Sequence, residues 1–594
     1  MFTSHEMKAS AILKVSLIFA CIAVFSSQAV SLSGDEEVSP PCSAVDRAAL
    51  LSFKSSILED TTGILSSWTG ADCCGAWEGI TCNPTTGRVT TLQLQRPLNG
   101  DAFMKGNLSP SLGNLQFLEV MIISGMKKIS GKIPESFSRL NHLIQLYLED
   151  CMLEGSIPSS LGRLTSLKYL SLSGNLLTGQ LPPSLGSIKG LVQINLSKNR
   201  LVGAIPSTFG NLRSLEYLDM NTNMLSGVIP TFIGQYQNLS GLDLSYNQFS
   251  GEIPNSLCSL SKARSISLNN NKLIGKIPTQ IDRLKSLTTL SLSANLLNGL
   301  LPDSLGRLQK LWSLNLARNG FSGPLPKGLQ NGLPSLISLD LSYNKFHLGT
   351  IPNWIRSRKL VDIRLAGCNI RGSLEPFVSP DSMGSIDLSV NYLTGEIGGF
   401  FKNMTILSEI NLSSNMLTSD ISKLLLPNSL GTLDLHSNQL HGSVSGLLQD
   451  LNMLSVLDIS SNRIRGAMPE FNDGLRLKLL NLSNNRIAGQ IPSSISKLRN
   501  LQKIDLSRNH INGVIPPSMG QMNKLEWLDL SRNRLRGSIP YTFTKLLKVK
   551  HLNLRANSLC GEIPQSRPFN IFPAAAYGQN LCLCGKPLAP CKKS

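Results

Sequence analysis

The side chains best suited to covalent chemistry are cysteines gathered near the two ends of the chain. Eight of the twelve cysteines form two groups of four: Cys42, Cys73, Cys74, Cys82 and Cys560, Cys582, Cys584, Cys591. Thiols grouped in this way form disulfides in an oxidising compartment or bind zinc. Adjacent cysteines and a Cys-x-Cys spacing do not match the usual Cys-x-x-Cys spacing of zinc ligands. We therefore predict disulfides and no metal site, while spacing alone leaves the pairing open.

No spacing of polar residues in the sequence is typical of an enzyme. The chain has no nucleophile elbow, no phosphate-binding glycine loop and no zinc-binding histidine motif. Its seven histidines are scattered. We predict a protein without catalytic activity and without a cofactor.

The first 29 residues have the pattern of a secretory signal peptide. Lys8 and Lys14 precede the apolar run 15–25, and small residues at Ser27 and Ala29 precede a cleavage point. The run is shorter than the roughly 20 residues of a membrane-spanning helix, and no later segment is long and apolar enough to span a bilayer. We predict that residues 1–29 are removed and that the protein is secreted to the extracellular space, with no membrane span.

A nine-residue frame, LxxLxLxxN, recurs through most of the chain. Its last residue recurs every 24 residues from Asn175 to Asn319 and continues to Asn557 at similar spacing, with Cys368 replacing one Asn. Less regular copies upstream bring the total to about 20. The alternating pattern indicates a short strand with inward leucines, and the following LxGxIPxxLGxL indicates a bend and 3₁₀ turns. Stacked copies predict an α/β solenoid, a right-handed leucine-rich-repeat superhelix with a parallel sheet on its concave face.

Both ends of such a solenoid need a cover, because an open end exposes core side chains and strand edges. We place an N-terminal cysteine cap at 30–88, the repeats at 89–559 and a C-terminal cysteine cap at 560–594. The segment DRAALLSFKSSIL in the first cap has helical apolar periodicity. We expect each cap to be held by its own four cysteines.

The chain resembles plant extracellular leucine-rich-repeat proteins. The resemblance rests on GxIP in the repeats, on DRAALLSFK followed by SSW, DCC and WEGITC, and on the four-cysteine tail. TCNPTTGRVTTL, LEVMIISGMKKISGKIP and the C-terminal Cys-x-Cys are similar to polygalacturonase-inhibiting and DNA-damage-repair/toleration proteins, whereas the repeat number is similar to that of receptor-like protein ectodomains. The resemblance implies the pairs Cys42 with Cys73, Cys74 with Cys82, Cys560 with Cys582, and Cys584 with Cys591.

Bulky side chains at the outward positions of the strands are the candidates for ligand binding. Most outward positions carry Ser, Asp or Asn and follow the repeat consensus. Aromatic residues and arginines depart from it and are favoured at interface hot spots, although any single one can be incidental surface variation. We predict a binding stripe of Tyr147, Tyr169, Tyr217, Tyr246, Trp312, Arg318, Tyr343 and Arg364.

The chain is basic, with a formal net charge of +18. Loss of residues 1–29 removes two lysines and one glutamate and leaves +17. Near the C-terminus, basic residues cluster around the repeated Asn: Arg463, Arg486, Arg508, Arg532, Arg534, Lys550 and Arg555. We interpret this strip either as a binding site for acidic pectin or an acidic partner, or as a solvated surface that aids solubility. Nucleic acid is not an expected partner outside the cell.

Six N-x-Ser/Thr sequons are expected to carry glycans in a secreted protein: Asn107, Asn195, Asn238, Asn403, Asn411 and Asn481. Three of them, Asn195, Asn411 and Asn481, occupy outward strand positions, so binding patches should lie between these sites. Residues 371–450 lose the regular Ile-Pro pair, which predicts a local change in curvature.

These features favour recognition over catalysis. We predict a secreted protein that binds a protein or peptide ligand on its concave face in plant defence or developmental signalling, with a receptor kinase ectodomain as a candidate partner. The alternative is an inhibitor of microbial polygalacturonase or a pectin-associated cell-wall protein.

Overall fold

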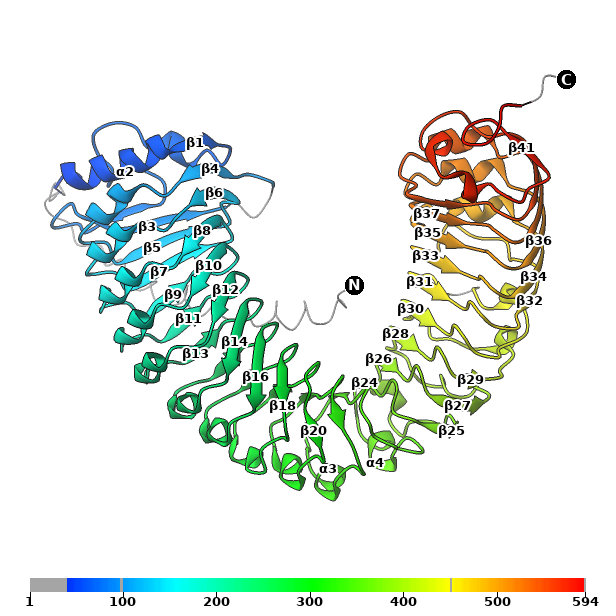
Figure 1. Cartoon of the computed structure of the whole chain (residues 1–594), viewed down its shortest axis with the longest axis horizontal. Helices are drawn as coiled ribbons and strands as arrows, with labels where there is room; N and C mark the ends of the chain where they lie inside the picture. Colours follow the sequence, from blue (N-terminus) through cyan, green and yellow to red (C-terminus); the bar gives the residue numbers. More distant parts are fainter. Residues whose placement is uncertain (1–39, 97–99, 449–450, 592–594) are drawn as a thin grey trace, which may run out of the picture.

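The computed structural model describes residues 40–96, 100–448 and 451–591. The predicted signal peptide, residues 1–29, lies outside the described residues, as does Pro97, the last residue of the first predicted repeat. The described chain winds into a strongly curved solenoid whose two capped ends face each other across an opening (Figure 1). The predicted leucine-rich-repeat fold is therefore confirmed.

One long sheet lines the concave side, and from β3 onward its strands are parallel neighbours in chain order. At its N-terminal edge β2 pairs antiparallel with β3. The strands are β2 (Ile80–Cys82), β3 (Val89–Gln95), β5 (Val120–Ser124), β7 (Gln145–Glu149), β9 (Tyr169–Ser171), β11 (Gln193–Asn195), β13 (Tyr217–Asp219), β15 (Gly241–Asp243), β17 (Ser265–Ser267), β19 (Thr289–Ser291), β21 (Ser313–Asn315), β23 (Ser338–Asp340), β24 (Asp362–Arg364), β26 (Ser385–Asp387), β28 (Glu409–Asn411), β30 (Thr432–Asp434), β31 (Val456–Asp458), β33 (Leu479–Asn481), β35 (Lys503–Asp505), β37 (Trp527–Asp529) and β39 (His551–Asn553).

A second set of strands follows the repeated Asn in each coil and forms what we call the flank sheets. The first contains β1 (Ile57–Asp60), β4 (Met104–Asn107), β6 (Lys128–Gly131), β8 (Met152–Ser156), β10 (Leu176–Gln180), β12 (Arg200–Gly203), β14 (Met224–Val228), β16 (Gln248–Glu252) and β18 (Lys272–Ile274). Two short sheets follow, β20 (Asn298–Gly299) with β22 (Gly320–Phe321), and β25 (Arg371–Ser373), β27 (Tyr392–Gly395) and β29 (Met416–Leu417). The last contains β32 (Arg465–Gly466), β34 (Arg486–Gln490), β36 (His510–Val514), β38 (Arg534–Gly537), β40 (Ser558–Glu562) and β41 (Cys582–Cys584).

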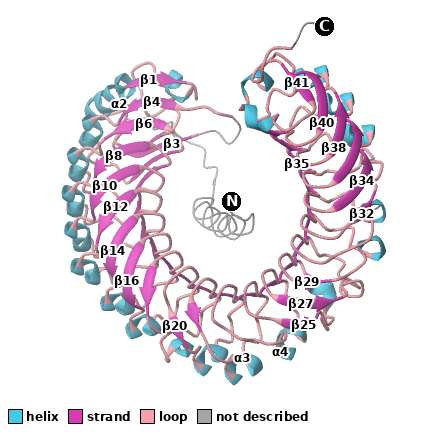
Figure 2. Cartoon of the chain, turned by 45° about the vertical axis from the view of Figure 1, so that its right-hand side comes forward, coloured by secondary structure: helices cyan, strands magenta, loops and turns pink. Residues whose placement is uncertain are grey.

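Except for the 13-residue N-terminal helix, the helices are short, and along the repeats they lie on the outer side of the coils (Figure 2). The α-helices are α2 (Ala44–Ser56), α3 (Lys327–Asn331) and α4 (Asn353–Arg356). The 3₁₀ segments are η1 (Ile64–Ser67), η2 (Pro110–Asn114), η3 (Glu135–Arg139), η4 (Ser159–Arg163), η5 (Pro183–Ser187), η6 (Ser207–Asn211), η7 (Thr231–Gln235), η8 (Asn255–Ser259), η9 (Ile281–Arg283), η10 (Asp303–Arg307), η11 (Pro380–Ser382), η12 (Ile421–Lys423), η13 (Val444–Gly446), η14 (Ser493–Lys497), η15 (Pro517–Gln521), η16 (Tyr541–Lys545), η17 (Phe569–Ile571) and η18 (Ala574–Ala576). Proline before most of them fixes the backbone at their start.

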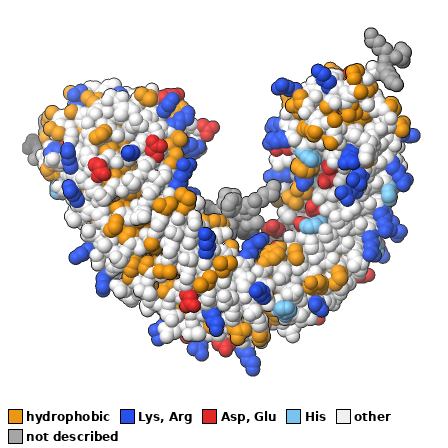
Figure 3. Space-filling view, in the orientation of Figure 1, with side chains coloured by type: hydrophobic (Ala, Val, Ile, Leu, Met, Phe, Trp, Pro, Cys, Tyr) orange, Lys and Arg blue, Asp and Glu red, His pale blue; other side chains and the backbone are white. Residues whose placement is uncertain are grey.

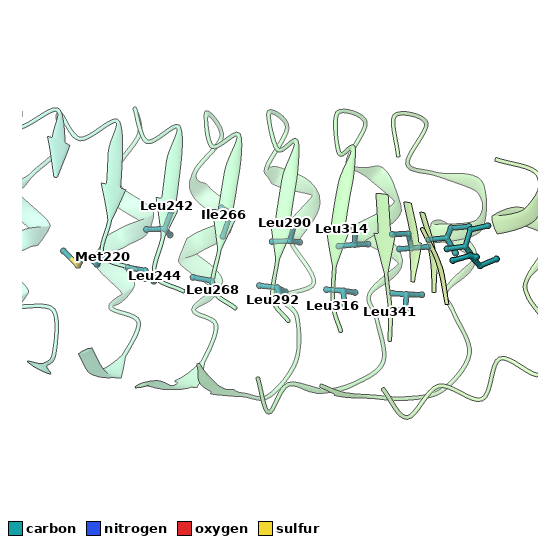
Figure 4. Packing of buried hydrophobic residues seen from close by; sticks show 14 of the residues in the cluster. Met220, Leu242, Leu244, Ile266, Leu268, Leu290, Leu292, Leu314, Leu316 and Leu341 are labelled. Carbon is teal, nitrogen blue, oxygen red and sulfur yellow. The ribbon is translucent and has the colours of Figure 1, made fainter. Parts of the chain in front are cut away.

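The core is a stack of leucine rows, because the two apolar positions of each frame recur in register. Leu242 lies opposite Leu218 and Ile266 on the neighbouring strands, and Figure 4 shows the same alignment for Leu290 and Leu314. These side chains are almost completely buried. Each contributes about 2 kcal/mol of apolar burial, so stability accumulates coil by coil.

The repeated Asn connects each coil to the one before it. The Asn247 Nδ2 donates to the carbonyl oxygens of Met220, at 2.9 Å, and of Leu244, at 3.2 Å. Its Oδ1 accepts the N–H of Leu225 at 3.0 Å. Buried backbone groups that no strand can pair are thereby satisfied. The ladder also extends past the predicted last repeat, since Asn580 donates to Leu554 and accepts from Leu559.

The N-terminal cap covers the first coil with α2 and is held together internally by two disulfides. Helix α2 buries Leu50 and Phe53, and Trp68 stacks on Trp77 with ring centroids 5.4 Å apart.

The disulfides of the two caps join Cys42 with Cys73, Cys74 with Cys82, Cys560 with Cys582, and Cys584 with Cys591, which are the pairs that the resemblance implies. The C-terminal cap also continues the solenoid, because β41 pairs with β40 in parallel register.

Candidate functional site

A group of bulky outward side chains lies near the middle of the concave sheet. Trp312, Ile337 and Val361 directly precede β21, β23 and β24. The N–H of Ile337 donates to the carbonyl of Trp312 at 2.9 Å, and the N–H of Val361 donates to the carbonyl of Ile337 at 2.8 Å. The three residues are 40%, 38% and 41% exposed. Because they lie side by side on successive coils, they form one exposed apolar row.

An Arg–Tyr pair lies at the other end of the same strands, directly before the repeated Asn. The guanidinium of Arg318 lies over the Tyr343 ring, 4.6 Å from its centroid. Both residues have a left-handed backbone, with φ of 55° and 54°. That conformation disfavours any side chain with a Cβ, yet two bulky residues occupy it on adjacent coils. The pair presents an aromatic ring with a positive charge beside the concave surface.

Arg364 lies between the apolar row and the Arg–Tyr pair. Its Nε is 3.3 Å from the Asp362 carboxylate. Burial alone lowers the pKa of Arg364, but the charges of Asp362, Asp340 and Glu409 outweigh it and raise the pKa. Arg364 is therefore a fixed cation surrounded by carboxylates. We call Trp312, Ile337, Val361, Arg318, Tyr343 and Arg364 the central patch.

The four tyrosines predicted in the first half do not join one cluster. Tyr147 in β7 and Tyr169 in β9 lie on neighbouring strands, whereas Tyr217 is in β13 and Tyr246 follows β15. All four are half-buried. Tyr217 lies opposite Gly241, where a Cβ would come within 3.0 Å of its ring. The glycine therefore leaves room for the ring on the sheet surface.

The predicted basic strip is divided between two faces. Arg486 and Arg534 begin strands of the C-terminal flank sheet, and Arg463 lies two residues before its first strand. Arg508 and Arg532 lie at the corner between that sheet and the concave sheet, with left-handed backbones. Arg555, also near this corner, donates to Gln579. Lys550 precedes β39, at the opposite end of the concave strand, and pairs with Glu526 at 2.7 Å. Stacking does not bring Lys550 to the flank arginines, because the whole concave strand lies between them.

The sequons also fall into two groups. Asn107, Asn238 and Asn403 are exposed, whereas the concave Asn195, Asn411 and Asn481 are half-buried. In each concave case the Asn Oδ1 accepts from the Ser two residues later, as in the 2.7 Å bond from Ser197 to Asn195. Glycosylation of the six asparagines remains a prediction.

The three cysteines outside the disulfides are buried: Cys151, Cys258 and Cys368. Burial raises the pKa of Cys151 and of Cys368 to about 12. A thiol that stays protonated at ordinary pH is a poor nucleophile. These cysteines therefore have a packing role, and two of them take the place of the repeated Asn.

Two further sets of outward residues lie on the concave sheet and were not among the predicted site residues. The predicted stripe contained only aromatic residues and arginines, so it left out Ile337 and Val361. An aliphatic residue at an outward position that is polar in other repeats is a sequence signal that could have identified both. The second set is Lys503, Trp527 and His551 on β35, β37 and β39. The Trp527 and His551 rings stack at 3.5 Å, and the Lys503 Nζ lies 4.8 Å from the Trp527 ring centroid.

Two groups of side chains in the described residues have the composition of a metal site, and one of them, Cys42, Cys73 and Cys74, is already bonded in disulfides. Asp434, His436 and Asp458 lie on or beside neighbouring concave strands, with candidate ligand atoms within 4.8 Å of one another. Protein donors already occupy these carboxylates, because His436 donates to Asp434 and both Ser460 and Asn481 donate to Asp458. The group is therefore a hydrogen-bonded cluster on the concave surface.

None of the helices in the described ranges could cross a bilayer.

The inward leucines, the Asn ladder and the concave parallel sheet define a leucine-rich-repeat solenoid. Consistent with this class, the model of the leucine rich repeat N-terminal domain matches residues 43–83. Leucine rich repeat models match 142–164, 166–188, 189–249, 286–308, 335–357, 454–511, 475–535 and 499–559.

Comparisons with known proteins place the chain among plant members of this class. The DNA damage-repair/toleration protein DRT100 of Arabidopsis thaliana is 35% identical over 111 residues, which are 17% of this chain and 30% of that protein. The ectodomain of the Arabidopsis receptor kinase GASSHO1/SCHENGEN3, solved with CASPARIAN STRIP INTEGRITY FACTOR 2, is 31% identical with a TM-score of 0.72, over 91% of this chain and 64% of that one. The Arabidopsis receptor kinase HAESA, solved with the peptide hormone IDA and the co-receptor SERK1, is 30% identical with a TM-score of 0.57, over 93% and 100%. The chain therefore belongs to the plant leucine-rich-repeat family of ectodomain-type proteins.

Proposed function

We propose that the protein binds an extracellular protein or peptide ligand on its concave face and acts in plant defence or developmental signalling. The observation that carries this proposal is the central patch, where an exposed apolar row and two arginines meet on three successive strands. Rigid strands hold these side chains in place, so little conformational entropy is lost on binding. Aromatic and Arg side chains are the types that dominate binding energy at interfaces.

The form of the patch favours a peptide or an extended protein segment. The apolar row runs across the strands, so a segment that follows the solenoid can place successive side chains on Trp312, Ile337 and Val361. The Arg–Tyr pair and Arg364 lie alongside and supply charged hydrogen-bond donors. Two similar ectodomains were solved in complex with an integrity factor or a peptide hormone, which supports a protein or peptide ligand here.

We further propose that residues 1–29 direct secretion and that the protein acts in the extracellular space or cell wall, with a receptor kinase ectodomain as a partner. The oxidised caps and the chain's relatives support this location. The alternative function is inhibition of a polygalacturonase, in which case the protein partner is that enzyme.

The test compares two isoleucines of similar exposure on different faces. Ile337 is 38% exposed in the central patch, and Ile274 is 45% exposed on the first flank sheet. Partners are isolated from plant extracellular fluid and solubilised membranes with the secreted chain, and their affinity is measured for Ile337→Asn, Trp312→Ala and the control Ile274→Asn. We expect binding to weaken at least about tenfold for the two patch variants and to be unchanged for the control.

Equal affinity for all variants would refute the central patch as the ligand site. Recovery of a polygalacturonase whose activity the chain inhibits, with no peptide or receptor partner, would replace the proposal by the inhibitor alternative.

A further inference from the structure

The exposed side of the C-terminal flank sheet carries a group of basic side chains that the concave site does not use. Four of them are the residue after the repeated Asn in successive coils, and two lie two positions further on. The six are Arg463, Arg486, His510, Arg534, Arg465 and Arg536, and all are exposed. We call them the basic flank. Figure 3 shows Lys and Arg gathered at the right-hand outer edge of the molecule, over β32, β34 and β36 of Figure 1.

The basic flank has no acidic partners in the described part of the chain. None of the ion pairs found there involves any of the six residues. Across β32, β34, β36, β38 and β40 the one carboxylate is Glu562, at the end of β40. Arg465 also lies opposite Arg486 on the neighbouring strand. Like charges placed opposite each other destabilise a sheet, and a bound anion would remove that repulsion.

The spacing of the charges fits a linear anion. Parallel strands are about 4.8 Å apart, so the four coils from Arg463 to Arg534 span about 14 Å in one direction, with an arginine on three of the four. Each guanidinium can hold a carboxylate through two parallel hydrogen bonds. A chain that carries a carboxylate on each repeating unit can therefore contact several coils at once.

The remaining outward positions favour a polysaccharide over an acidic protein. They include Ala488, Gln490 and Asn512, with Val514 as the one large apolar side chain. No aromatic residue projects from these strands, whereas protein interfaces depend on buried aromatic and aliphatic anchors. The amides of Gln490 and Asn512 can donate to and accept from sugar hydroxyls.

We propose that the basic flank binds a linear acidic polysaccharide of the polyuronate type, whose carboxylates pair with arginines of successive coils. The site is separate from the central patch, because the flank strands face away from the interior of the arc (Figure 2). The protein can therefore be held on an acidic matrix while its concave face stays open. The proposal does not depend on the identity of the concave ligand.

The test removes the same charge from two different faces. The flank variant carries Arg463→Gln, Arg486→Gln and Arg534→Gln. The matched control carries Arg139→Gln, Arg163→Gln and Arg213→Gln, which are exposed residues at or next to the outer 3₁₀ segments. Binding of the intact secreted chain to oligogalacturonates of increasing length is measured at several salt concentrations. Fully methyl-esterified oligomers, which lack the charge, and poly-L-glutamate are measured in parallel.

We expect the flank variant to bind oligogalacturonate at least tenfold more weakly and with a shallower salt dependence, because fewer counterions are released. The control should change less than twofold, and the esterified oligomer should not bind. Affinity should rise with oligomer length until the oligomer spans the four coils. Equal losses in both variants, or unchanged binding of the esterified oligomer, would overturn the proposal. Tighter binding of poly-L-glutamate than of oligogalacturonate would overturn it in favour of an acidic protein partner.

Discussion

Asp46 and Arg88 form a buried two-point ion pair that joins the first turn of α2 to the start of the concave sheet. The Asp46 carboxylate is 2.8 Å from the Arg88 Nε and 2.9 Å from its Nη2. It also accepts the N–H of Val89 at 2.9 Å. Asp46 is fully buried, whereas the Arg88 side chain is 22% exposed. Among the polar contacts between the N-terminal cap and the solenoid, which include those of Ser52 with Ser109 and Ser111, the Asp46 carboxylate supplies the buried charge.

Substitution Asp46→Ala should destabilise the cap strongly. Removing one partner of a buried ion pair leaves the other charge uncompensated, which typically costs about 3–5 kcal/mol. We expect faster amide hydrogen exchange in α2 and a lower denaturation midpoint. The control is Asp282→Ala, which breaks the exposed Arg307–Asp282 pair and should cost less than about 1 kcal/mol. Similar effects of the two substitutions would contradict the role given to Asp46.

The Asn ladder predicts a large difference between two asparagines only two coils apart. Asn247→Ala removes the side-chain acceptor of the Leu225 N–H and one of the two Asn donors to the Met220 carbonyl, which keeps Asn223, so we expect a loss of about 1–3 kcal/mol in the free energy of unfolding. Asn298→Ala changes an exposed side chain at the start of β20 and should change stability by less than about 0.5 kcal/mol. Chemical denaturation of both variants measures the difference, and equal midpoints would refute the ladder's role in stability.

Val390 offers a test of the backbone conformation before the repeated Asn. Its φ is 55°, and a β-branched residue is strained in this left-handed region. Val390→Asn should therefore stabilise the protein by up to about 1 kcal/mol, because Asn tolerates this conformation. The control is Val514→Asn, a similarly exposed valine in the extended strand β36, where loss of β propensity should be neutral or destabilising. A fall in the denaturation temperature of Val390→Asn would contradict the interpretation.

The repeating elements were predictable because every coil must bury the same apolar positions and satisfy the same backbone groups. The inward leucines, the ladder Asn and the bend at the glycine of LxGxIP all follow from a 24-residue period. The continuation of the ladder to Asn580 was missed because the segment before it, FPAAAYGQN, lacks the leucines of the frame. Tyr577 fills the space instead, buried and donating to the Phe569 carbonyl at 2.6 Å.

The site was only partly predictable, because its residues meet across coils. Trp312 and Arg364 were visible as unusual outward residues, but their position beside Ile337 and Val361 depends on the stacking register. The basic strip shows the same limit. Lys550 and Arg534 were grouped because both lie near a repeated Asn in the sequence. The chain direction through the coil, however, places Lys550 before the concave strand β39 and Arg534 on the flank strand β38.

His436 predicts a pH dependence of stability in the second half of the concave sheet. Its Nδ1 lies 2.7 Å from the Asp434 carboxylate, and this hydrogen bond raises the pKa of His436 above its usual 6.5, with burial opposing and the charges of Asp434 and Asp458 assisting. A raised pKa in the folded state means that the folded protein binds the proton more tightly than the unfolded chain. The stabilisation is therefore fully present below pH 6.5 and is lost as pH rises through the raised pKa.

Comparison of the wild-type protein with His436→Asn between pH 5 and pH 9 tests this prediction. The wild-type advantage in the free energy of unfolding should shrink as pH rises, by less than about 1 kcal/mol because the His436 side chain is 36% exposed and screened by water. In the Asp434→Asn variant, the NMR titration midpoint of His436 should move down toward 6.5, because the charged acceptor is gone. A wild-type midpoint at or below that of Asp434→Asn would show that the carboxylate does not hold the proton on His436.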